Sequence, residues 1–181
     1  MCKENIAKNV VFLDYDGVVN TPMWSDDGEV CRFNYPSDNK VNNFQAVQWV
    51  SEFCKEFGYS IVVTSTWRLS KNYKECLING GLRKGIEILG RTESISNASR
   101  GKEIKKYLDA HPEIEKFLIF DDEDDVGGLS SHLVLCSVEN GFGMNEYGKA
   151  SEMHKDYDEK VIGGESIEYE QLTLFDMLDG E

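Results

Sequence analysis

Carboxylates and hydroxyls that could do chemistry stand directly after three short apolar runs of the sequence. Apolar runs of four or five residues, rich in β-branched side chains, are typical of buried strands. In an open parallel sheet, ligands bind at the carboxyl ends of the strands, so these polar side chains are predicted to meet at one edge. The three groups are Asp14 and Asp16 after residues 9–13, Thr64 and Ser65 after 59–63, and Asp121 and Asp122 after 116–120.

Two of these groups bring carboxylates close together if their strands are neighbours. Like charges at short range repel, so such a site persists only with a compensating cation. Hard oxygen ligands suit Mg²⁺, and we therefore expect a magnesium site. Arg100 or Lys102, at the start of a predicted helix, would balance the rest of the negative charge.

The elements that must position these groups alternate between strand and helix. Apolar residues recur at helical spacing over 41–57 and 100–110, and a further helix is expected over 71–78. Residues 132–136 are a fourth predicted strand, and 86–89 a minor one. This order, with strands that are apolar almost throughout, predicts an α/β fold with a parallel sheet covered by helices on both faces.

The charge of the chain is unevenly distributed. The 181 residues carry 33 acids and 19 lysines and arginines, a formal net charge of -14. Residues 151–181 hold ten acids and two lysines, and Asp14, Asp16 and the run 121–125 hold seven acids; the remainder has 16 acids and 17 bases. The body of the protein is close to neutral, so its charge raises no objection to a phosphate-bearing polymer as a partner.

Composition excludes several classes of protein. With 40% apolar and 11% aromatic residues the chain can form a core, which excludes wholesale disorder. The apolar runs are far below the ~20 residues that span a bilayer. The N-terminus has Lys3 and Lys8 but no apolar segment, so we expect neither a membrane anchor nor a signal peptide. Five scattered cysteines without a C-x-x-C pair indicate reduced thiols and a cytoplasmic protein.

Four motifs in order resemble those of the haloacid dehalogenase (HAD) superfamily of phosphotransferases: VVFLDYDGVVN, IVVTSTWR, RGKEIKKYL and FLIFDDEDD. The STWR ending, the GRT before the third motif and the DD after an apolar strand resemble a narrower group, the capless HAD domains of phage and bacterial proteins and of RNA-repair proteins. This resemblance implies a Rossmann-like HAD domain, placed here at residues 1–150, followed by an acidic tail over 151–181.

The spacing of the motifs leaves no room for a large cap domain. The insert at 20–39 is too short for a folded cap, and the segment between the second and third motifs is also short. An open site suits large substrates such as nucleic-acid ends, proteins or bulky nucleotides, whereas small metabolites usually need a lid that excludes water.

The resemblance implies the roles of a phosphatase for the first two motifs. Asp14 would attack phosphorus and form an aspartyl-phosphate. Asp16 would protonate the leaving oxygen and then activate water in the second step. Thr64, with Ser65 as the alternative, would donate a hydrogen bond to the phosphoryl oxygens.

The acids of the first and fourth motifs form the implied metal site. Asp121 or Asp122 would bind Mg²⁺ together with Asp14 and neutralise charge between nucleophile and phosphate. Asp16 and Asp125 are the further candidate ligands, and Asp125 could instead orient waters or the base of the third motif.

Three cations are candidates to bind phosphate. The superfamily more often has lysine in the third motif, whereas here Arg100 precedes Gly101 and Lys102, and either Arg100 or Lys102 could stabilise the phosphoryl group. Arg68 could bind the phosphate end, because a guanidinium matches phosphate bidentately. Its neighbour Trp67 is expected to pack in the core.

Two other folds use similar acidic patterns. An EF-hand loop starting at Asp14 would need glycine and glutamate where Val19 and Ser25 stand. In a receiver domain the acidic pair follows the first strand and the phosphorylated aspartate a middle one, the reverse of the order here.

A segment of the tail, from Gln171 to Phe175 (QLTLF), closely resembles the pentapeptide by which bacterial proteins dock onto the replication sliding clamp. Leu174 and Phe175 would enter an apolar pocket, and Gln171 would fix the orientation. The alternative is a C-terminal strand or helix that packs on the domain.

These observations favour a Mg²⁺-dependent phosphomonoester hydrolase acting on a nucleotide or a nucleic-acid terminal phosphate. The alternative is a clamp-binding or regulatory module with a vestigial HAD site, against which the complete set of acidic ligands argues. A phosphotransferase that passes the phosphate to an acceptor other than water is a third hypothesis.

Overall fold

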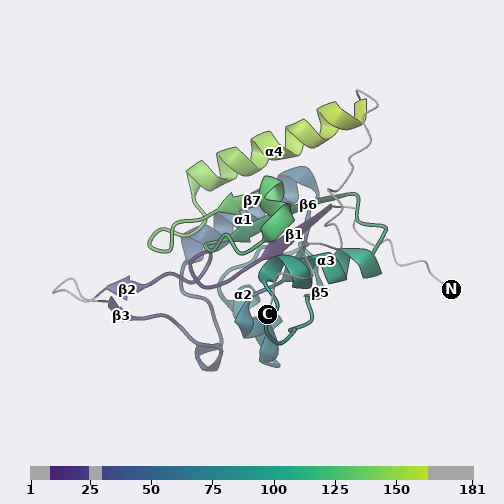
Figure 1. Ribbon diagram of the computed structural model, residues 1–181. Coiled ribbons are helices and arrows are strands. Elements are labelled where there is room, and N and C mark those ends of the chain that lie inside the picture. The colour runs from purple at the N-terminus through teal and green to yellow at the C-terminus, as the bar shows by residue number, and fades with distance from the viewer. Residues whose placement is uncertain (1–8, 25–29, 163–181) are drawn as a thin grey trace.

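The computed structural model describes residues 9–24 and 30–162. Its centre is a parallel five-stranded sheet in the order β5-β4-β1-β6-β7 (Figure 1). Because the chain passes from β1 to one side and later returns to the other, β1 lies between β4 and β6 at the topological switch point, where α/β sheets bind ligands. The strands are β1 (Asn9–Leu13), β4 (Ser60–Val63), β5 (Ile88–Arg91), β6 (Lys116–Asp121) and β7 (Leu133–Leu135).

Helices cover both faces of this sheet, as the sequence predicts. Alternate residues of β1 point to opposite faces: Val11 and Leu13 pack with the helices of one face, and Val10 and Phe12 with those of the other. The α/β, Rossmann-like fold is therefore confirmed. The first face carries α1 (Phe44–Phe57), α2 (Tyr73–Asn79) and α4 (Met144–Ile162), and the second carries α3 (Arg100–Ala110) and the 3-10 helix η3 (Gly127–His132).

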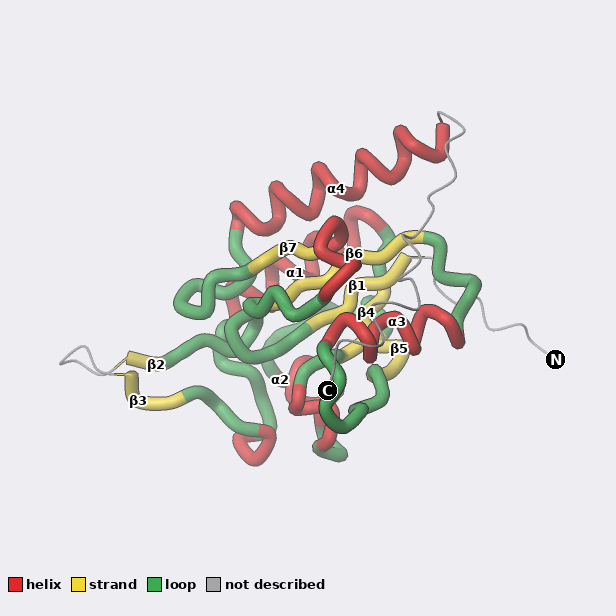
Figure 2. Tube along the Cα trace, in the orientation of Figure 1, coloured by secondary structure: helices red, strands yellow, loops and turns green. Residues whose placement is uncertain are grey.

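The insert before α1 contains a small hairpin, which the sequence pattern did not reveal. Strands β2 (Met23–Trp24) and β3 (Val30–Arg32) pair antiparallel and extend away from the main sheet (Figure 2). The short 3-10 helix η1 (Pro36–Asp38) follows. Two strands this short form no domain of their own, so the prediction that the protein has no large cap is confirmed.

The predicted boundary after residue 150 falls inside α4 and is corrected by the structure. Ala150 and Tyr157 are buried in the core beside α1, so the chain packs on the domain well beyond this point. The many acids of this stretch obscured the helical spacing of Tyr147, Ala150, His154 and Tyr157. The segment from Gln171 to Phe175 lies outside the described residues.

None of the helices that the structure describes is both long enough and apolar enough to cross a lipid bilayer.

Candidate active site

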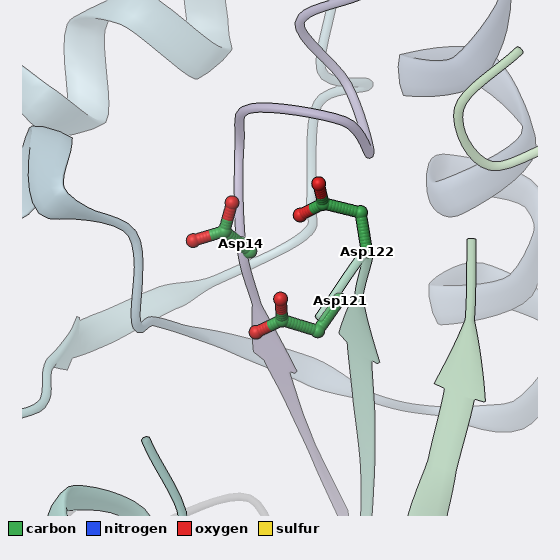
Figure 3. Close-up of side chains that lie close together, drawn as sticks. All are labelled: Asp14, Asp121 and Asp122. Atoms are coloured by element: carbon green, nitrogen blue, oxygen red, sulfur yellow. The ribbon is translucent and has the colours of Figure 1, made fainter. Parts of the chain in front are cut away.

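Three aspartate carboxylates meet at the carboxyl ends of β1 and β6 (Figure 3). Leu13 pairs with Phe120 in the sheet, so Asp14 and Asp121 follow side by side, and Asp122 approaches from the same strand end. One oxygen of each carboxylate lies within 4.8 Å of the others. Asp14 is 4% exposed and Asp121 is fully buried. Adjacent parallel strands thus place the acids of two distant motifs in one group.

The two most buried carboxylates of this group have pKa values above the ordinary value of an aspartate. Burial raises the pKa of Asp14 to about 6, although Arg100 opposes the shift. Burial and the charge of Asp14 raise the pKa of Asp121 to about 7. Oδ2 of Asp121 is buried and accepts no hydrogen bond from the described residues. Crowded carboxylate oxygens, one of them buried and accepting no hydrogen bond, are a donor set that fits Mg²⁺.

Gly17 makes room for Asp122. Its φ of +72° lies in the left-handed region, and a Cβ at this position would stand 2.4 Å from Cγ of Asp122. The glycine of the D-x-D-G motif therefore serves both the sharp turn after β1 and the close approach of the acid from β6.

Arg100 supplies the positive charge at the start of α3. Its Nη1 lies 2.6 Å from Oδ1 of Asp14 and 3.4 Å from Oδ2 of Asp121. Burial lowers the pKa of Arg100, but these two carboxylates more than offset that effect and raise it above its ordinary value. Lys102 is exposed on α3. Of the two basic residues considered for the third motif, the structure brings Arg100 to the acids.

The loop after β6 docks on the first turn of α3 and so places Arg100. The carboxylate of Asp125 accepts from the backbone N–H of Arg100 at 3.1 Å, and the carbonyl of Asp125 accepts from that of Gly101 at 3.3 Å. A Cβ on Gly101 would stand 2.2 Å from the carbonyl oxygen of Val126. Asp125 thus lies outside the three-carboxylate group and orients the residue that neutralises it.

Asp16 also lies outside that group of acids. Its carboxylate accepts from the Asn20 side chain at 2.5 Å and from the indole Nε1 of Trp67 at 3.0 and 3.2 Å. Asp16 is half-buried, whereas Trp67 is almost fully buried. Among the described residues, the acids that converge as a possible metal site are Asp14, Asp121 and Asp122.

Thr64 and Ser65 are both fully buried at the end of β4, but their hydroxyls differ. The backbone N–H of Thr64 donates to the carbonyl of Leu13 at 2.9 Å, which places Thr64 beside Asp14. Its hydroxyl has no hydrogen-bond partner among the described residues. Oγ of Ser65 accepts from the backbone N–H of Trp67 at 3.3 Å and caps the 3-10 helix η2 (Thr66–Leu69).

A family model described as the HAD domain in Swiss Army Knife RNA repair proteins matches residues 10–146. The chain belongs to this HAD family. The matched range contains every site residue described above, and the predicted resemblance is confirmed. No curated protein matches the chain.

Arg68 of this HAD domain faces the interior. Its Nη2 lies 2.6 Å from Oε2 of Glu103, and Nη1 donates to the carbonyl of Thr64. The other oxygen of Glu103 accepts from the backbone N–H of Ile95 at 2.9 Å. Arg68 therefore joins the end of β4 to α3, and its two terminal nitrogens are engaged by protein groups.

Three residues of the HAD site make contacts that were not predicted from the sequence. Trp67 was predicted to pack and does so against Tyr15, with ring centroids 5.7 Å apart, but its N–H also reaches Asp16. Asn20 follows Asp16 by four residues across a glycine turn, a local signal that could have suggested its contact. Glu103 stands 35 residues from Arg68, and no local pattern links them.

Proposed function

We propose that this HAD domain is a Mg²⁺-dependent phosphomonoester hydrolase that acts through an aspartyl-phosphate on Asp14. The observation that carries the proposal is the convergence of Asp14, Asp121 and Asp122 at the switch point of the sheet, with Arg100 beside them. A buried carboxylate group of this kind is costly without a cation, which supports a catalytic role over a structural one.

Asp14, Asp121 and Asp122 would hold the magnesium ion. When bound, Mg²⁺ would offset the repulsion between the Asp14 carboxylate and an incoming phosphate. The buried Oδ2 of Asp121 supports this assignment, because its only positively charged neighbour among the described residues is Arg100 at 3.4 Å and it accepts no hydrogen bond there, which costs free energy.

In the first step a carboxylate oxygen of Asp14 attacks phosphorus, and the bond from phosphorus to the leaving oxygen breaks. Asp16 gives its proton to that oxygen. In the second step water attacks the phosphorus, Asp16 takes a proton from it, and the bond to Asp14 breaks to release inorganic phosphate. The hydroxyl of Thr64, which has no partner among the described residues, and the guanidinium of Arg100 supply hydrogen bonds to the phosphoryl oxygens.

The substrate that we propose is a nucleotide or the terminal phosphate of a nucleic acid. The small β2–β3 hairpin in place of a cap supports a substrate too large to be enclosed. The description of the matched family, which names RNA repair proteins, supports a nucleic-acid end.

A substrate panel tests the proposal. We would compare 3′- and 5′-phosphorylated oligoribonucleotides, mononucleotides, sugar phosphates and phosphopeptides, each with Mg²⁺ and with EDTA. We expect Mg²⁺-dependent release of inorganic phosphate, fastest from the oligonucleotides or mononucleotides. Phosphate passed to another acceptor, with no inorganic phosphate released, would indicate a phosphotransferase.

Matched variants show whether the measured phosphatase activity comes from the proposed site. Asp14→Asn should abolish activity, and Asp124→Asn, which changes an exposed acid of the same DDEDD run, should retain it. Activity that survives Asp14→Asn, or that is equal in EDTA, contradicts the mechanism. A folded wild-type protein inactive on the whole panel would favour the vestigial site.

We propose separately that the segment from Gln171 to Phe175 docks on a bacterial sliding clamp. The sequence QLTLF supports this partner. The full chain should be captured by an immobilised clamp, and a chain that ends at Glu170 should not. Equal capture of both chains contradicts the proposal.

A further inference from the structure

Trp67 reaches Asp16 across a long stretch of sequence. Its Nε1 lies 3.0 Å from Oδ2 and 3.2 Å from Oδ1 of Asp16, 51 residues away. The ring is 3% exposed and is fixed by an edge contact with Tyr15. A buried indole N–H needs an acceptor, and here that acceptor is the proposed acid and base of the reaction.

The two oxygens of Asp16 are not equivalent. Oδ1 accepts from Asn20 and from Trp67, whereas Oδ2 accepts only from Trp67 among the described residues. A carboxylate oxygen accepts about two hydrogen bonds, so Oδ2 keeps a free position. Oδ2 is therefore the oxygen with room to contact a leaving group.

The indole N–H orients a carboxylate that lies outside the group of acids proposed to bind metal. Asp16 is only two residues from Asp14, yet its carboxylate is not part of the group that Asp14 forms with Asp121 and Asp122. A neutral donor orients it without the charge that an arginine or lysine would add. Trp67 itself is placed by Ser65, directly after Thr64.

We propose that Trp67 is a positioning residue that aims Oδ2 of Asp16 at the leaving oxygen and thereby sets how well the enzyme expels poor leaving groups. The inference rests on the proposed phosphatase function. Trp67 touches no reacting atom; it acts through Asp16, which delivers its proton as the bond from phosphorus to the leaving oxygen breaks.

The test compares leaving groups in Trp67→Phe, which keeps a ring but lacks the N–H. An alkyl ester such as β-glycerophosphate needs a proton on its leaving oxygen, whereas p-nitrophenolate departs without one. We expect kcat/KM for β-glycerophosphate, which reports the steps up to departure of the leaving group, to fall about tenfold or more, part of the 10²–10⁴ available from general acid catalysis, while p-nitrophenyl phosphate loses less than about threefold. Both esters form the same aspartyl-phosphate, so a slower second step would lower kcat for both and leave the ratio of their kcat/KM values unchanged.

Two further variants separate positioning from packing. Trp49→Phe removes an indole N–H from α1 and should leave the ratio of the two kcat/KM values unchanged. Trp67→Gln keeps an N–H donor without the ring and should keep the wild-type ratio better than Trp67→Phe. The ratio within one variant does not depend on the folded fraction, so it stays meaningful for an unstable variant.

The outcomes are distinct. Equal losses for both esters in Trp67→Phe, or no loss for either, overturn the role of Trp67 while the phosphatase stands. A folded wild-type protein that hydrolyses neither ester nor any member of the substrate panel overturns the proposed function and this inference with it.

Discussion

Asp14 and Asp16 are two residues apart on the same strand end, yet their carboxylates lie in different surroundings. Asp14 is 4% exposed, close to two other acids, and its oxygen lies 2.6 Å from the guanidinium of Arg100. Asp16 is half-buried and accepts hydrogen bonds from an amide and an indole, both neutral. Asp14 contacts a charged guanidinium, whereas the hydrogen-bond donors to Asp16 are neutral.

This difference explains how one residue type can take two roles. A carboxylate in a charged group that a cation would complete suits a nucleophile that stays ionised. A carboxylate held by neutral donors, with a free acceptor position on one oxygen, suits proton exchange with the leaving group and with water. Pairs of titratable groups in contrasting environments are a recurrent arrangement of acid–base catalysis.

The largest expected effect separates the two aspartates directly. Asp14→Asn should lower kcat for every phosphomonoester at least about a thousandfold, because it removes the nucleophile. Asp16→Asn should lower kcat for β-glycerophosphate about a hundredfold or more, but for p-nitrophenyl phosphate clearly less in the first step. Steady-state and burst kinetics with both esters measure this, and identical losses in the two variants would remove the distinction.

The buried ion pair between Arg68 and Glu103 joins the end of β4, beside Asp14, to α3, and its contribution to stability can be tested. Glu103→Ala leaves the buried guanidinium of Arg68 without its partner and should lower the free energy of unfolding by about 3–5 kcal/mol. Glu93→Ala breaks the exposed 2.7 Å pair with Lys106 and should cost at most about 1 kcal/mol. Urea unfolding measures both; equal costs would show that the buried pair contributes no more than an exposed one.

Two glycines with nearly the same φ allow the cost of backbone strain to be separated from the cost of side-chain crowding. Gly58→Ala, at the end of α1 with φ +71° and open space around it, should cost about 1–2 kcal/mol. Gly17→Ala, with φ +72°, should cost about 1–3 kcal/mol more because its Cβ would collide with Asp122. Gly17→Ala should also weaken Mg²⁺ binding in calorimetry. Similar costs and unchanged binding would mean that Asp122 moves aside freely.

The last expected effect is a pH dependence of stability. The pKa values of Asp14 and Asp121, about 6 and about 7 in the fold, lie above the ordinary value of 3.8. Between pH 4 and pH 7 the folded state therefore binds more protons than the unfolded state, and the stability contributed by these groups is lost as pH rises. Mg²⁺ should reverse this loss and stabilise the protein more at pH 8 than at pH 5.

Thermal unfolding in EDTA and in Mg²⁺ measures this effect, at about 2–4 °C in Tm for each kcal/mol. Asp121→Asn should flatten the decline in EDTA and reduce the gain from Mg²⁺. A wild-type Tm that rises from pH 5 to pH 7 in EDTA to the same extent as that of Asp121→Asn would contradict the assigned shifts.

The sequence by itself determined the parallel sheet and the residues at its strand ends. Strand and helix periods are local, so the apolar runs predicted four main strands, and the polar residues after them predicted that Asp14, Thr64 and Asp121 would meet. The hairpin and α4 were missed because a two-residue strand has no measurable period and because dense acids obscured the apolar face of the helix.

Only the tertiary structure decided which side chains touch. It brought Arg100 to Asp14 and left Lys102 exposed, turned Arg68 toward Glu103, and placed the indole of Trp67 on Asp16. These contacts join residues 35 to 86 positions apart. Local propensity carries no information about such pairs, because their geometry depends on how separate elements pack rather than on the period of any one of them.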